Sequence, residues 1–140
     1  MAIHYSINPK FDLIIYVCKG LITASEFFKI QDLAALEKDY KKSGMTSIID
    51  LFLASADFEL EDLRHVINYA KRTGFEYGKT VILTRNKAVH LTVNALNLMS
   101  NGIDLKIASS DSMESALTSI GFSKDIQEII QFWNESKSFK

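Results

Sequence analysis

The chain has 140 residues, a formal net charge of −1 and a single cysteine, Cys18. This length suits one domain with a substantial core, and the near-neutral charge excludes the general electrostatic footprint of a nucleic-acid-binding protein. One cysteine excludes an internal disulfide and a cysteine-rich metal site. The first residues lack the pattern of a signal peptide, and the apolar runs are too short to span a membrane. We therefore expect a cytoplasmic protein.

The N-terminal part of the sequence predicts a β-hairpin. Apolar residues alternate with polar ones over 3–7, which is typical of a half-buried strand, and residues 8–10 carry a turn signal. A second strand is expected over 11–19 and should end at Gly20. Its run 13–18 is apolar at every position, as in strands that are covered on both faces.

A helix should follow the hairpin. Thr23 and Glu26 have the spacing of a capping box, in which each side chain satisfies a backbone amide of the other residue. The apolar spacing after it predicts a helix to about Lys42.

The stretch 46–71 is expected to form the centre of the fold. It predicts a short buried strand over 47–52, a loop over 53–56 and an amphipathic helix from Asp57 to about Lys71. The units before and after it are variations on the same strand–loop–helix step.

The next unit should be a strand over 80–84, a turn at 85–86 and a third helix. Five residues at helical spacing predict one side of that helix: Ala88, Leu91, Ala95, Leu98 and Met99. The last strand is expected over 103–108.

Two short helices should complete the chain. Asp111 and Glu114 have capping-box spacing before a helix that ends near Ile120, and a final helix is expected over 123–136. Strands that alternate with helices predict an α/β fold with a mixed, largely parallel sheet of about five strands. We expect one domain over 1–122 with the C-terminal segment 123–140 packed on it as an extra helix.

Three stretches then carry a resemblance to a known family. They are a hairpin strand into a capped helix (VCKGLITASEF), a strand that ends in an acidic residue before a loop (SIIDLFLASADFELEDL), and a late strand into a short helix (LKIASSDSMESALTSIGF). With the element order, over roughly 3–122, the chain resembles the bacterial STAS/SpoIIAA-like domains, which include anti-sigma-factor antagonists and STAS/SEC14-like proteins. The resemblance implies binding or regulation more than catalysis.

The antagonists of this group carry a phosphorylatable residue in an Asp-Ser-Ser-Gly-like turn. The matching region here runs from Asp50 to Asp57, and Ser55 is its candidate phosphorylation site. The Ser-Gly pair is missing and an acidic residue follows, which argues against a phosphorylation switch.

Ligands of open α/β sheets bind near the carboxyl ends of the strands. The candidate residues for ligand or partner binding there are Asp50, Ser55, Asp57, Thr84, Arg85, His90 and Ser110. Arg85 would hold an anion beside a helix N-terminus, unless it only caps a helix or pairs with an acid. Asp50 is more simply explained as a cap of the following loop, and His90 as a structural histidine.

Nothing in the sequence predicts a catalytic set, a cofactor or a metal site. The histidines lack ligand spacing, and no glycine-rich phosphate loop is present. The pairs Phe27-Phe28 and Phe132-Trp133 cannot all face one core, because adjacent helical residues diverge by about 100°. A partner or an apolar ligand would cover the remaining rings.

We therefore expect a non-enzymatic regulatory or protein-interaction domain whose protein partner the sequence does not identify. The alternative is a SEC14-like binder of a small apolar or lipid-like ligand, and a third hypothesis is an enzyme that uses Asp50, Arg85 or His90. Right-handed crossovers would gather the connecting helices on one face of the sheet. The C-terminal helix or a second copy must cover the other face, which makes a homodimer a prediction.

Overall fold

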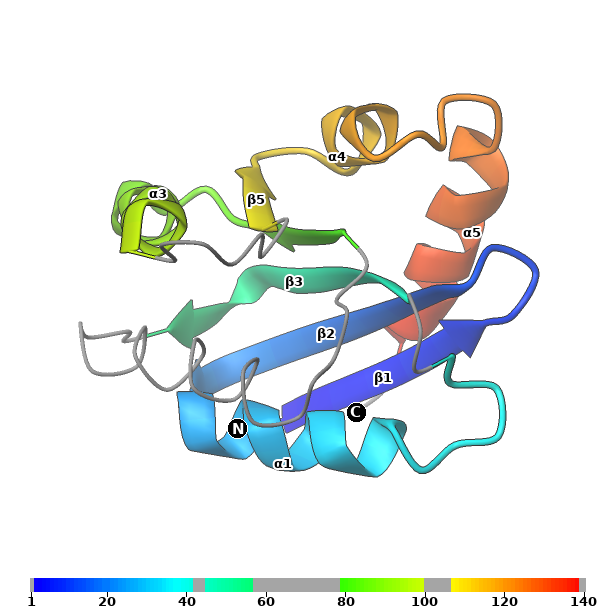
Figure 1. Ribbon diagram of the computed structural model, residues 1–140, viewed down its shortest axis with the longest axis horizontal. Helices are drawn as coiled ribbons and strands as arrows, with labels where there is room; N and C mark the ends of the chain where they lie inside the picture. The colour runs from blue at the N-terminus through cyan, green and yellow to red at the C-terminus, as the bar shows by residue number, and fades with distance from the viewer. Residues whose placement is uncertain (1, 42–44, 57–78, 100–106, 139–140) are drawn as a thin grey trace.

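The structure is a computed structural model that describes residues 2–41, 45–56, 79–99 and 107–138 (Figure 1). The described strands are β1 (Ala2–Asn8), β2 (Leu13–Ile22), β3 (Thr46–Ala56), β4 (Thr80–Leu83) and β5 (Ile107–Ser110). They form one sheet in the order β1-β2-β3-β4-β5, with β1 antiparallel to β2 at the edge and the other neighbours parallel. The predicted α/β class, largely parallel sheet and N-terminal hairpin are confirmed.

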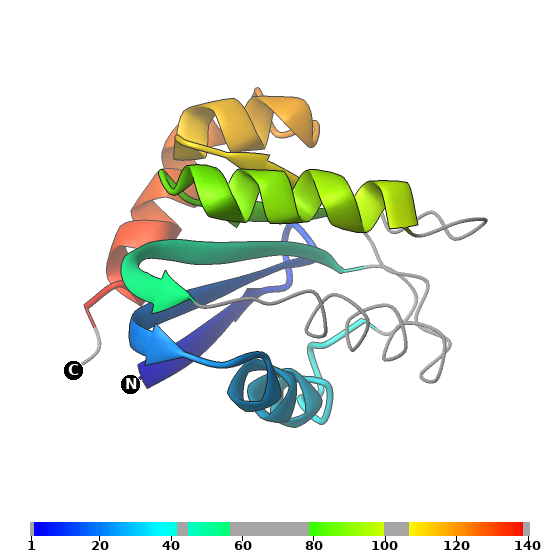
Figure 2. The same ribbon diagram turned by 90° about the vertical axis from the view of Figure 1, so that its left-hand side faces the viewer.

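Helices lie on both faces of this sheet. The described helices are α1 (Ala24–Ala34), α3 (Lys87–Met99), α4 (Met113–Ser119) and α5 (Ile126–Ser136). In one core cluster, Leu117 of α4 and Ile129 of α5 pack with one face of the sheet. Ala34 of α1 and Val89 of α3 belong to the clusters on the opposite face. Figure 2 shows α5 on one side of the sheet and α1 on the other.

The apolar run of β2 explains this layering. Leu13, Ile15 and Val17 point to the α4–α5 face, whereas Ile14 and Tyr16 point to the α1 face. Each of these side chains is at most 1 % exposed, so β2 is covered on both faces. Because successive strand residues point to opposite faces, an uninterrupted apolar run supplies two cores at once.

The first helix has its predicted start but not its predicted end. The Thr23 hydroxyl accepts from the Glu26 amide, and the Glu26 carboxylate accepts from the Thr23 amide, so the capping box is confirmed. The helix ends at Ala34 instead of about Lys42. Tyr40 and Met45 pack into the core cluster beneath α1, so the chain must leave the helix axis to place them.

The central strands run further than predicted. The expected stop at Gly20 and the expected loop over 53–56 are both wrong, because Lys19↔Leu53 to Ile22↔Ala56 continue the parallel pairing. Gly20 has a φ of 76°, which a glycine adopts without strain. One residue of β2, Cys18, lies opposite two residues of β3, Leu51 and Phe52, so β3 carries a bulge there.

The third helix buries a different side from the one predicted. Val89 and Val93 are buried, whereas Leu91 and Leu98 are 67 % and 85 % exposed. Both stripes are apolar, so periodicity alone did not select the buried one.

The C-terminal part also differs in detail. Ser112, not Asp111, is the N-cap of α4, since its hydroxyl accepts from the Ser115 amide at 3.2 Å. The last helix begins at Ile126 rather than 123. Phe132 and Trp133 both pack, partly buried, against the same core cluster, so the expectation that one of them faces away from this core is wrong. The predicted helix over 57–71 and the start of the predicted strand over 103–108 lie outside the described residues.

Candidate functional site

The candidate site begins where β4 stops and β3 continues. The two strands pair only from Ser47↔Thr80 to Asp50↔Leu83. Beyond Asp50, β3 runs on for six residues beside β2 and, among the described residues, has no strand partner on its other side. The loop from β4 into α3 lies next to that edge.

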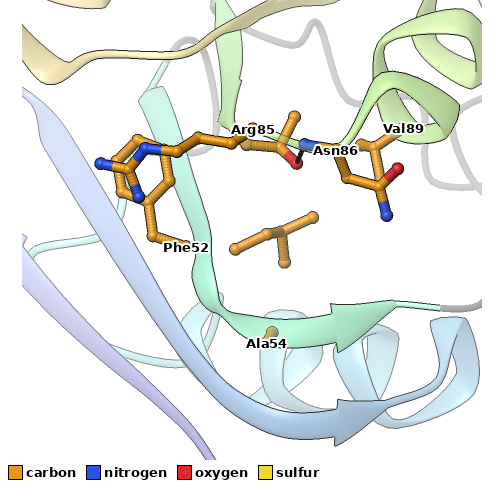
Figure 3. Close-up of a pocket in the computed structure, with 7 residues that line it drawn as sticks. Phe52, Ala54, Arg85, Asn86 and Val89 are labelled. Carbon is orange, nitrogen blue, oxygen red and sulfur yellow. Dashed lines mark hydrogen bonds between the residues drawn. The ribbon is translucent and has the colours of Figure 1, made fainter.

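A pocket of about 320 Å³ occupies this place (Figure 3). Its lining residues are Leu51, Phe52, Ala54, Thr84, Arg85, Asn86 and Val89. Four of them are apolar and come from β3 and α3, and three are polar and follow β4. An apolar floor with a few polar groups at one side is the usual composition of a ligand site.

Arg85 is the charged group of the pocket. Its guanidinium carbon lies 4.2 Å from the centre of the Phe52 ring, in cation–π geometry. In Figure 3 its side chain extends over that ring. The residue is exposed, and it has no carboxylate partner among the residues that the structure describes. The planar guanidinium therefore presents its donors at the pocket, where it can bind a carboxylate or another anion.

The backbone beside Arg85 is fixed by local hydrogen bonds. The Thr84 hydroxyl accepts from the Asn86 amide at 3.0 Å. The Asn86 side-chain oxygen accepts from the Ala88 amide at 2.9 Å and caps α3, a role for which Asn is among the preferred residues. Short polar side chains at 84 and 86 thus set the position of Arg85 between them.

His90 ties this loop to β5. Its Nε2 lies 3.0 Å from the Thr84 carbonyl oxygen, and its Nδ1 lies 2.6 Å from the Ser109 hydroxyl oxygen. A carbonyl oxygen only accepts, so Nε2 donates and, in the neutral ring, Nδ1 accepts from Ser109. Both ring nitrogens are used to hold α3 against the sheet, and His90 does not line the pocket.

Asp50 is buried inside the fold and is not among the residues that line the pocket. It is 1 % exposed, and each carboxylate oxygen has a donor. Oδ1 accepts from the Phe52 amide at 2.9 Å, and Oδ2 accepts from the Trp133 indole nitrogen at 2.7 Å. The first bond holds the β3 bulge, and the second holds α5 on the sheet.

The remaining predicted residues are dispersed. Ser55 lies in strand β3, exposed and paired in register with Leu21, not in a loop before a helix. The Ser110 hydroxyl donates to the Ser112 carbonyl at 3.0 Å and so stabilises the turn into α4. Asp57 lies outside the described residues. The structure thus brings Thr84 and Arg85 together in the pocket and gives Asp50, His90 and Ser110 roles in holding nearby elements.

The described residues offer little to a metal ion or a nucleophilic reaction. They contain no group of three or more histidine, cysteine or acidic side chains that could hold a metal. Cys18 is fully buried, and burial together with the charge of Asp50 raises the pKa of its thiol to about 12. A thiol with this pKa is a poor nucleophile at neutral pH.

None of the four apolar lining residues was predicted as a site residue: Leu51, Phe52, Ala54 and Val89. Leu51 and Phe52 belong to the predicted strand, Ala54 to the predicted loop, and Val89 to the predicted third helix. No local pattern placed them together, because the position of the β4 end beside them depends on pairing between distant segments.

A comparison with solved structures identifies the fold. The chain is similar to the crystal structure of an uncharacterised protein of the DUF3478 family, with a SpoIIAA-like fold, from Shewanella loihica PV-4. The TM-score is 0.56 at 13 % sequence identity, over 85 % of this chain and 92 % of the other. This chain has a SpoIIAA-like fold. The predicted resemblance to STAS/SpoIIAA-like domains is confirmed at the level of fold.

The SpoIIAA-like fold does not by itself assign an activity, since one fold hosts many functions. No protein-family model matches the sequence, and no curated protein matches it. In the described part of the chain, none of the helices is both long and apolar enough to cross a membrane. A function must therefore be argued from the pocket and its surroundings.

Proposed function

We propose that this SpoIIAA-like domain is a non-enzymatic regulatory or protein-interaction module that binds through the pocket beside Arg85. One observation carries the proposal: the polar side chains most suited to chemistry hold the fold together, while the pocket is lined by four apolar side chains, two uncharged polar side chains and the charged Arg85. Asp50 and His90 each have two hydrogen-bonding contacts inside the protein, and Cys18 is buried. Arg85 is left as an exposed charge above an apolar floor.

Such a pocket suits an anchor side chain of a partner. Interface anchors fill desolvated pockets, and arginine is common where partners meet. The partner would insert an apolar side chain against Leu51 and Val89 and place an acceptor on Arg85. A cytoplasmic location, expected from the sequence, belongs to this proposal.

Site-specific photo-cross-linking tests the proposal. A photoreactive residue replaces Asn86 on the pocket rim, and a matched variant carries it at Glu114, an exposed position of α4. We expect a discrete protein adduct from position 86 in an extract of the cells that express the chain. The adduct should disappear when Ala54→Trp fills the pocket. Equal adducts from both positions, or steady turnover of a defined substrate that Arg85→Ala abolishes, would contradict the proposal.

The apolar floor favours one second function, a SEC14-like binder of a small apolar or lipid-like ligand. A volume of about 320 Å³ lies at the lower end of small-ligand sites. Native mass spectrometry of freshly purified protein is the test. A co-purifying mass that Ala54→Trp removes, and that Ala108→Trp on exposed β5 retains, would support it. An unliganded mass in both variants and in the unmodified chain would exclude it.

A further inference from the structure

Two exposed leucines lie side by side near the carboxyl ends of the central strands. Leu21 of β2 is 63 % exposed, and Leu53 of β3 is 58 % exposed. In the register, Leu53 lies opposite Lys19, and Leu21 lies opposite Ser55. Residues that are in register on parallel strands share a face, and so do residues two apart on one strand. Leu21 and Leu53, which we call the leucine surface, therefore share one face of the sheet.

The leucine surface lies on the same face of the sheet as α5. The Lys19 ammonium group donates to the Lys137 carbonyl oxygen at 2.9 Å, at the C-terminal end of α5. Lys19 therefore points to the α5 face, and Leu21, two residues on, lies beyond the end of the helix.

Aromatic rings and cations border the leucine surface. The Phe52 and Trp133 rings lie 6.3 Å apart at 58°. The Lys137 ammonium group lies 3.7 Å from the Trp133 centroid, and Arg85 lies over Phe52. Neither Lys137 nor Arg85 has a carboxylate partner in the described part of the chain. The border thus carries positive charge that a partner can complement.

The β3 bulge helps to build this arrangement. It sets Phe52, the ring beneath Arg85, directly before Leu53 on the same face. The Asp50 carboxylate holds the Phe52 amide at the bulge and Trp133 on α5. The buried Asp50 therefore holds both Phe52 and Trp133 in position, next to the start of the leucine surface.

We propose that the leucine surface docks an acidic, amphipathic segment of a partner protein. This inference rests on the proposed interaction function, and it names the chemistry of the partner. Aliphatic side chains of the segment cover Leu21 and Leu53, and its carboxylates lie on Lys137 and Arg85. Neighbouring strands are only about 4.8 Å apart, so two leucines make a narrow strip that fits a linear segment. Complementary charge at the border raises association rate and specificity.

A peptide fits these observations better than a membrane surface. Membrane-binding elements insert several apolar side chains from a protruding loop or an amphipathic helix. Here the leucines lie on a pleated sheet, and the cations Arg85 and Lys137 are both held over aromatic rings. Fixed cations at defined positions suit individual carboxylates.

The test is selection from a random dodecapeptide phage library on the full chain, with counter-selection on Leu53→Asp. We expect enriched sequences that combine aliphatic residues with Asp or Glu. A synthetic peptide of the enriched sequence should lose about tenfold or more in affinity with Leu53→Asp, as at an interface hot spot. Lys137→Glu should weaken it about as much, and added salt should weaken it further. The matched controls Leu36→Asp, at an 81 % exposed leucine, and Lys124→Glu should leave the affinity unchanged.

Several outcomes would overturn the inference. They are the absence of enrichment, an enriched sequence without acidic residues, or an affinity that the leucine and lysine variants leave unchanged. Binding to phosphatidylserine vesicles that Leu53→Asp abolishes would assign the surface to a membrane instead. A dimer in sedimentation velocity that Leu53→Asp dissociates would assign it to a second copy.

Failure here is distinguishable from failure of the proposed function. Cross-linking from position 86 without acidic peptide selection would retain the pocket as a binding site and reject this partner chemistry. Absence of both would reject the two proposals together. The circular dichroism spectrum of each variant should match that of the unmodified chain. A loss of affinity then reports a change at the surface and not a loss of folding.

Discussion

Replacing Trp133 by Phe should destabilise the protein mainly through one hydrogen bond. The change keeps an aromatic ring on the core but removes the indole donor to Asp50, which is 1 % exposed and 2.7 Å away. A hydrogen bond to a charged group contributes about 1.5–3 kcal/mol. The smaller ring adds about 1 kcal/mol for lost packing. We expect the free energy of unfolding to fall by about 2.5–4 kcal/mol, from the sum of these two contributions.

A double-mutant cycle with Asp50→Asn isolates the hydrogen bond. An asparagine has one acceptor oxygen, so it satisfies only one of the two donors, the Phe52 amide and the Trp133 indole. Asp50→Asn should therefore cost about 1–3 kcal/mol alone. In the Trp133→Phe background only the Phe52 amide needs an acceptor, so the cost should fall by about 1 kcal/mol or more.

Urea unfolding followed by far-ultraviolet circular dichroism measures all corners of the cycle. Fluorescence does not serve, since Trp133 is the single tryptophan of the chain. Phe132→Leu, a neighbour on the same core cluster, is the control for lost packing without a lost hydrogen bond. An equal cost of Asp50→Asn in both backgrounds would refute the reasoning.

Three further predictions concern single residues. Cys18 should not react with Ellman's reagent at pH 8 in the folded protein, because burial raises its thiol pKa to about 12, whereas an Ala108→Cys thiol on exposed β5 should react at once; rapid labelling of Cys18 would contradict its burial. Thr23→Ala should lower the free energy of unfolding by about 1 kcal/mol through loss of the α1 cap, and Ser25→Ala, on the exposed side, should not. His90→Ala should cost about 1–3 kcal/mol in the same assay, since two contacts between α3 and the sheet are lost; an unchanged midpoint would show that the bridge contributes nothing.

The sequence predicted those parts of the fold that local patterns determine. The apolar run 13–18 predicted a strand buried on both faces, and Thr23 with Glu26 predicted the start of α1. Both signals act within a few residues of their own position. The order of strands and helices followed from the same local patterns and from the handedness of crossovers.

The parts that failed depend on contacts between distant segments. Residues 53–56 have the composition of a loop, yet they are held as strand by pairing with 19–22 of β2. The α3 helix has two apolar stripes, and only its position on the sheet selects Val89 and Val93.

The residues of the candidate site also divide into those that local patterns predict and those that depend on distant segments. Residues 84–86 were expected at the carboxyl end of their strand because the turn signal is local, and they line the pocket there. Asp50 was also expected at a strand end and as the cap of a loop. It does bind the amide two residues on, but its second partner, Trp133, is 83 residues away. No local pattern could have paired them.

Truncation after Gly121 should abolish the cooperative fold. It removes α5, with which Leu13, Ile15, Val17 and Ile48 share a core cluster. Burial of Ile129 alone is worth about 1.5–3 kcal/mol. Five partly buried aromatic or aliphatic side chains are removed by the same truncation, and Asp50 is left with one donor. The sum approaches the whole stability of a typical domain, about 5–15 kcal/mol.

The truncated chain should therefore bind a hydrophobic dye, lose its unfolding transition and self-associate in sedimentation velocity. A chain shortened only after Ser138 is the control and should behave as the full chain does. The homodimer was predicted from a sheet face left uncovered, and α4 and α5 cover that face within each chain. A stable, monomeric truncated chain would show that the face needs neither the helix nor a second copy. The layered packing would then not be what holds this sheet together.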